Sequence, residues 1–395
     1  MATARRVTGV EPASDGARAV AERMSAAASA WIDTLTEEQR SIGVWAGPDA
    51  DPERDGERRR WFYTPTDHGG LTLHQQRPAQ QRRAMALLST GTSRAGYVSA
   101  ATVMGLENVL DHTENFTIMF DRERGRDPGM YYLRVFGDPA GAAPWGWRFG
   151  GHHVSVSHLV VDGAVVASTP SFLGADPACA PLLGSLLRPL AGPEDIARDI
   201  MRSLATPLAD RALLLPKAPG DIIGANRTTL SDGDRVLSLV DFWRAPSADP
   251  AQQAGLQETS DAVDDLADLS DDEHAVLALT AAPKGLPAPE LDAEQRELLR
   301  RLLSTYLDRV PEEISVMGRY SDSVDGNAAL DAVHFAWAGS VAPGERHYYR
   351  LQGPRLLIEW DNTQRNVNHA HAAWRDPEAD FGLDVLAAHT VAHHS

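Results

Sequence analysis

Two pairs of polar side chains near the end of the chain have the spacing of metal ligands. Glu359 and Asp361 lie two residues apart in an apolar stretch typical of a β-strand, and His369 and His371 follow with the same spacing. Side chains two residues apart on a strand share a face, and neighbouring strands lie about 4.8 Å apart. If the two stretches pair, the four side chains surround one point. The pattern therefore predicts a site for a divalent metal ion.

The ligand types limit the identity of this ion. Two imidazoles with one or two carboxylates are a usual set for Zn²⁺, Mn²⁺ or Fe²⁺, and the sequence does not separate these metals. The alternative interpretation is a polar hairpin in which the same histidines and acids form hydrogen-bonded pairs.

A second histidine pair, His152-His153, follows Gly150-Gly151. Adjacent residues on a regular strand face opposite sides, so both rings reach one ion only if the glycines form a bulge or the pair lies at a strand end. We expect His153 or His152 to be a further metal ligand or a proton-transfer group; a buried, hydrogen-bonded histidine is the alternative. His158 lies roughly 20 Å from His152 along an extended strand and cannot share its ion.

Three further side chains are candidates for work on a substrate. Asp361 or Asp376 is predicted to act as a general base or to orient an imidazole. Arg375 is predicted to bind a substrate carboxylate through two guanidinium nitrogens. An ion pair of Arg375 with Asp376 or Asp380 is the alternative.

Charge and missing motifs narrow the class of partner. The formal net charge is −18, which repels polyphosphates and anionic membranes, so we expect a small-molecule substrate and neither nucleic acid nor a membrane. Lysine occurs only at Lys217 and Lys284; the excess of arginine is interpreted as a compositional habit, with anion recognition as the alternative. Nucleotide-binding glycine loops and a Gly-x-Ser-x-Gly elbow are absent from the sequence. Without a secretory signal, the cytoplasm is the expected location, although exported relatives are conceivable.

The elements that must position these residues fall into separate helical and strand blocks. Helices are predicted over 16–35, 78–112 with a break near 91–96, 193–213, 292–307 and 382–393. Strands are predicted over 61–63, 131–136, 147–158, 159–169 around an Asp162-Gly163 turn, 333–337, 347–352 and 355–361. This separation predicts an α+β fold with an antiparallel or mixed sheet flanked by helices.

We predict one domain over residues 1–395, with two sub-lobes as an alternative. Its parts are a mainly helical segment 17–130, a β-rich segment 131–240 with one helix, an acidic surface excursion 245–275, and a segment 290–395 in which a helix precedes β-hairpins carrying the histidines and acids.

Short motifs, several of them rich in tryptophan, histidine and aspartate, occur between residues 145 and 382. They are Trp145–Arg148 with Gly151–His153, Thr169–Ala175, Leu357–Asn362, Asn368–His371, Trp374–Pro377 and Asp380–Gly382. Together with 61–73 and 80–110, they resemble the DUF3500 family of bacterial proteins over nearly the whole chain. The resemblance implies no activity, because none is assigned to the family, but it emphasises the same histidine and acid positions.

We predict a metal-dependent enzyme, most simply a hydrolase of a small polar substrate, because a divalent ion lowers the pKa of bound water. A two-histidine, one-carboxylate set would equally suit a non-haem iron oxygenase or another oxidoreductase. The alternative from another class is a non-catalytic protein that binds a small anionic or sugar-like ligand, with Trp145, Trp147 and Trp374 as stacking faces.

Overall fold

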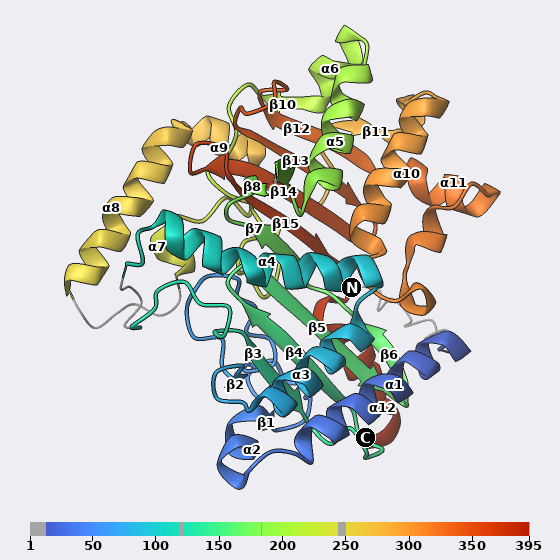
Figure 1. The fold of residues 1–395 in the computed structure, drawn as a ribbon. Helices are drawn as coiled ribbons and strands as arrows, with labels where there is room; N and C mark the ends of the chain where they lie inside the picture. The colour runs from blue at the N-terminus through green and yellow to red at the C-terminus, as the bar shows by residue number, and fades with distance from the viewer. Residues whose placement is uncertain (1–12, 118–121, 183, 244–249, 395) are drawn as a thin grey trace.

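The computed structural model describes residues 13–117, 122–182, 184–243 and 250–394. In these residues thirteen strands form one mixed sheet. Five helices lie on one face of this sheet (Figure 1): α1 (Asp15–Ile32), α3 (Pro78–Gly91), α4 (Arg94–Thr113), α5 (Ala191–Ser203) and α10 (Ala293–Leu307). The arrangement confirms the predicted α+β class. None of the described helices is long and apolar enough to cross a membrane.

The other helices are α2 (Glu37–Gly43), α6 (Thr206–Ala212), α7 (Leu239–Phe242), α8 (Pro250–Ala267), α9 (Asp271–Leu277), α11 (Val324–Asp331) and α12 (Leu383–His394). The predicted break within 78–112 is confirmed, since Ser93 accepts a hydrogen bond from the Gly96 backbone and starts α4. The predicted helix 193–213 is instead two helices, because Pro207 in the first turn of α6 favours a new helix start.

The strand order is β1 (Val44–Trp45), β3 (Tyr132–Phe136), β4 (Trp145–Gly151), β5 (Val154–Val161), β7 (Ser171–Ala175), β15 (His369–Arg375), β14 (Leu356–Gln364), β13 (His347–Gly353), β12 (His334–Gly339) and β10 (Leu213–Leu215). Strands β2 (Leu71–Thr72), β6 (Ala164–Ala167) and β11 (Leu286–Pro287) pair with β3, β5 and β12. A separate hairpin contains β8 (Ala180–Leu182) and β9 (Ser185–Leu187). The antiparallel pair β7–β15 joins the strands of the middle of the chain to those of its C-terminal part.

Two strand predictions are wrong in detail. Residues 61–63 pair with no strand; the Tyr63 carbonyl accepts a hydrogen bond from the His153 backbone instead. The stretch 147–158 is divided into β4 and β5 by a turn at His152 and His153. The Asp162-Gly163 turn is confirmed and joins β5 to β6.

The acidic segment 245–275 contains α8 and most of α9, at the edge of the molecule (Figure 1). Residues 244–249 lie outside the described ranges. One of the exposed large apolar side chains, Leu266, belongs to this segment.

The two faces of β14 and β15 differ in chemistry because side chains alternate along a strand. Ile358, Trp360 and Trp374 point into the main apolar core. Glu359, Asp361, His371 and Arg375 are also buried, on the opposite face. Buried charged groups are tolerated only when they are paired, so this face must find partners elsewhere in the chain.

The packing of α10 predicts a clear effect on stability. Leu303→Ala should lower the free energy of unfolding by about 2–5 kcal/mol, because Leu303 is fully buried in the main core. Arg301→Ala on the exposed side of the same helix should change it by less than about 0.5 kcal/mol. Urea unfolding of both variants checks this, and equal effects would contradict the described orientation of α10.

Candidate metal centre

His153 is placed by the turn between β4 and β5. Its backbone has a left-handed conformation, with φ of 63°, and its carbonyl accepts a hydrogen bond from the Gly174 backbone at 2.8 Å. A Cβ atom at Gly174 would lie 2.8 Å from the His153 ring, so only glycine leaves room for the ring there. The sequence requirement that the histidine pair lie at a strand end is therefore met.

Three imidazole nitrogens converge beside the β7–β15 pair. His369 and His371 project from the same face of β15, and His371 lies opposite Gly174 of β7. The Nε2 atom of His369 lies 2.8 Å from Nε2 of His153 and 3.1 Å from Nε2 of His371. Nitrogens bound tetrahedrally to one zinc ion at about 2.0–2.1 Å lie about 3.3 Å from each other. The three rings therefore have a spacing close to that of ligands of one ion.

Two carboxylates hold the other side of the His371 ring. Asp221 and Asp361 each place an Oδ1 atom 2.9 Å from Nδ1 of His371. Metal-bound histidines commonly donate their second ring N–H to a carboxylate, which fixes the tautomer. Nε2 of His371 is thereby directed at the other two imidazoles.

The electrostatics leave two of the rings uncharged. Burial and the neighbouring rings of His152, His369 and His371 lower the pKa of His153 well below its ordinary value. Burial and the nearby His371 likewise lower the pKa of His369. Neutral imidazoles offer lone pairs, which is the form that binds metals.

The pKa of His371 is shifted in the opposite direction from those of His153 and His369. Burial disfavours its cation, but Asp221 and Asp361 outweigh this and raise the pKa of His371 well above the ordinary value. Burial also raises the pKa of Asp361, to about 6. The carboxylates thus supply the negative charge that a cation at this place would need.

Asp221, Asp361 and His371 form a second group with ligand atoms near enough for an ion. Hydrogen bonds hold part of this group: the Ile222 backbone donates to Oδ1 of Asp221 and the Thr363 hydroxyl donates to Asp361. Oδ2 of Asp221 is buried without a hydrogen-bond partner among the described residues. In the three-histidine group the Nε2 atoms are directed at one another rather than at a carboxylate. We therefore prefer the three-histidine group as the metal position.

His152 lies beside this group without joining it. Its ring stacks on His153 with 3.8 Å between centroids, and its Nδ1 atom lies 2.5 Å from the buried carboxylate of Glu107. His152 also lines the cleft described next. Of the two roles predicted for this residue, the contacts favour proton transfer over metal binding.

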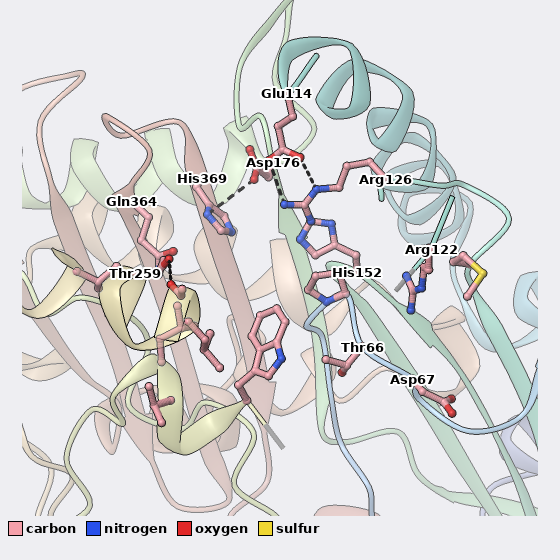
Figure 2. A pocket seen from close by; sticks show the side chains of 18 of the residues that line it. Thr66, Asp67, Glu114, Arg122, Arg126, His152, Asp176, Thr259, Gln364 and His369 are labelled. Carbon is pink, nitrogen blue, oxygen red and sulfur yellow. Dashed lines mark hydrogen bonds and ion pairs between the residues drawn. The ribbon is translucent and has the colours of Figure 1, made fainter. Parts of the chain in front are cut away.

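A cleft of about 1600 Å³ gives access to the centre. Figure 2 shows His369 on one wall and His152 with Arg126 on the other. Asp176 lies beside His369, with 3.9 Å between its Oδ2 atom and Nδ1 of the ring. Of the three converging imidazoles, His369 is the one that lines the cleft.

Glu359 does not reach the histidines, which corrects its prediction as a metal ligand. Its carboxylate accepts hydrogen bonds from the backbones of Ile223 and Gly224 at 2.9 and 2.7 Å, and from the Tyr348 hydroxyl at 2.7 Å. It is 1% exposed. Glu359 thus anchors the loop that carries Asp221.

The other candidates for substrate binding also have structural partners. Arg375 is fully buried and donates to Asp380 at 2.7 Å, so the ion pair weighed as its alternative role is present. Asp376 pairs with Arg355 and is absent from the metal-ligand groups of the described residues. The predicted stacking residues Trp145, Trp147 and Trp374 are buried in the main core and cannot stack on a ligand.

Sequence reasoning missed Asp221 and Glu107. Asp221 lies between a glycine and two isoleucines, Ile222 and Ile223, which is a signal of a buried loop. Glu107 lies on the apolar stripe of α4 and is 4% exposed. A carboxylate on a buried helix face requires a partner, and that signal was available in the sequence.

Together, the fold and site define an α+β protein with a candidate three-histidine metal centre at the side of a large cleft. A family model described as "Protein of unknown function (DUF3500)" matches residues 17–383, so the chain belongs to the DUF3500 family. Searches of curated proteins and of solved structures found no match to this chain.

The role of Glu359 is directly testable. Glu359→Ala should lower the free energy of unfolding by about 2–4 kcal/mol, because two buried backbone N–H groups lose their acceptor. Glu359→Gln, which retains one acceptor oxygen, should cost less. Metal content should be unchanged in both. A folded Glu359→Gln protein that has lost its metal would make Glu359 a ligand after all.

Proposed function

We propose that this protein is a metal-dependent hydrolase of a small polar substrate, with one divalent ion held by His153, His369 and His371. The observation that carries the proposal is the convergence of three Nε2 atoms, at 2.8 and 3.1 Å, beside a large cleft. Three protein ligands with an open fourth position are typical of catalytic zinc sites.

The ion would supply a Lewis acid that activates water for hydrolysis near neutral pH. The chain's own residues have separate tasks. Asp221 and Asp361 orient His371 through Nδ1. His152, oriented by Glu107 and lining the cleft, is in position to transfer a proton to or from a bound substrate.

The contacts give less support to the alternatives. An oxygenase of the two-histidine, one-carboxylate type needs a carboxylate at the ion. Here Asp221 and Asp361 contact Nδ1 of His371, while the imidazole of His369 lies 3.1 Å from its Nε2. A protein that binds a small ligand without catalysis is the other alternative. Its ligand could not stack on Trp145, Trp147 or Trp374, because these side chains are buried in the main core.

Metal binding is the first test. Purified protein should contain about one equivalent of a divalent metal, zinc in our proposal, and the double variant His369→Ala with His371→Ala should contain none. His74→Ala is the matched control, since His74 is exposed and absent from the candidate ligand groups of the described residues. Elemental analysis gives the stoichiometry, and circular dichroism checks folding.

Activity is the second part of the same test. Metal-loaded protein should hydrolyse members of a panel of chromogenic esters, amides and phosphoesters, and chelation should abolish turnover. A native protein that binds no divalent metal contradicts the proposal. If the protein instead contains stoichiometric iron, consumes oxygen and shows no hydrolysis, the proposed activity changes from hydrolase to oxygenase.

The orienting role of the acids gives a graded prediction. Asp221→Asn should weaken metal binding about 10- to 100-fold while leaving the three ligands in place. Competition with a chelating dye measures the affinity. Asp67→Asn is a control on the cleft wall, outside the metal-ligand groups of the described residues. Equal affinities in the two variants would remove Asp221 from the centre.

A further inference from the structure

We propose that the substrate of this cleft carries an oxyanion group, a carboxylate or a phosphate, which Arg122 binds together with Arg126 and Arg365 beside the metal centre. The inference rests on the proposed hydrolase function and extends it to a substrate class. It is carried by the charges of the cleft wall and by their contacts.

The cleft carries charge of the opposite sign to the protein. The chain has a formal net charge of −18. The cleft is nevertheless lined by five arginines and three carboxylates: Arg122, Arg126, Arg134, Arg346 and Arg365, with Asp67, Glu114 and Asp176. A divalent ion at the proposed centre would add to this positive excess. Clefts with one sign of charge concentrate ligands of the other sign.

Two of the arginines share one carboxylate close to the histidines. Arg126 donates to Glu114 at 2.7 and 3.0 Å, and Arg365 donates to the same carboxylate at 2.5 Å. Arg365 also pairs with Asp176 at 3.0 Å, and Asp176 is the acid beside His369. A chain of ion pairs thus links the cationic wall to a proposed metal ligand.

Arg122 is the cation that is available to a ligand. Its described side-chain contact is a hydrogen bond to the Tyr132 hydroxyl at 3.3 Å, and no described carboxylate lies within ion-pair distance. Figure 2 shows Arg122 and Arg126 on the same side of the cleft, with His369 across from them. Among the described residues Arg122 has no counter-ion, so its guanidinium group can pair with an anion that enters the cleft.

The chemistry of the guanidinium group selects the ligand. Its fork of N–H donors matches the paired oxygens of carboxylate and phosphate. An anionic end held by Arg122 would leave the rest of a substrate to extend past His152, on the same wall, and across the cleft toward His369. Thr66 and Gln364, which also line the cleft, offer hydrogen bonds to polar parts of such a molecule.

The experiment measures anion binding on metal-loaded protein. Calorimetric titrations use succinate and inorganic phosphate as probes, and succinamide as the neutral counterpart of succinate. We expect succinate or phosphate to bind, succinamide not to bind, and Arg122→Gln to weaken binding by about tenfold or more. Whichever of succinate and phosphate binds more tightly shows whether the site prefers a carboxylate or a phosphate.

Two variants keep the result interpretable. Arg365→Gln should weaken binding as well, and Arg211→Gln should leave it unchanged, because Arg211 pairs with Glu290 away from the cleft. Anion binding that is absent, or that is equal in wild type, Arg122→Gln and Arg365→Gln, overturns the proposal even when the metal is present. If the protein holds no metal but still binds the anion through Arg122, the hydrolase fails and the anion site stands.

Discussion

The antiparallel pairing of β7 with β15 is the constraint on which the candidate site depends. It places Gly174 opposite His371, and the missing side chain of Gly174 leaves space for the ring of His153. Two histidines from the C-terminal strand thereby meet one from a hairpin turn more than 200 residues earlier in the chain. A one-residue shift in the register of this pair would turn His371 to the other face of the sheet.

This pairing also creates a sheet face that is unusual for a protein core. On that face β14 and β15 bury acids, histidines and an arginine, and such groups are costly without partners. The loop around Asp221 provides hydrogen-bond partners for two of these buried groups. Its backbone N–H groups bind Glu359, while its own carboxylate binds His371. One acid therefore fixes the loop that brings another acid to His371, so the stability of this loop and the geometry of the candidate centre are coupled.

Charge is also distributed unevenly at the surface of this protein. A strongly acidic protein keeps arginines along one cleft, where Glu114 and Asp176 hold two of them in place. In our proposal, the overall charge would repel polyanions while the arginines of the cleft attract a small anion. Substrate selection by size and charge would then precede any chemistry at the histidines.

The sequence by itself determined the fold class, most helices, and the strand that carries His369 and His371, because hydrophobic periodicity and capping are local properties. It also marked Asp361 and the pair His152-His153 as candidates, since their types and spacing are visible in the chain, and left open which of the two histidines faces the site. Only the tertiary structure decided that Glu359 binds a loop, that Arg375 is paired with Asp380, and that Asp221 and Glu107 complete the site. Which polar groups meet depends on strand order and on loops that cross between distant segments, and no local pattern encodes those contacts.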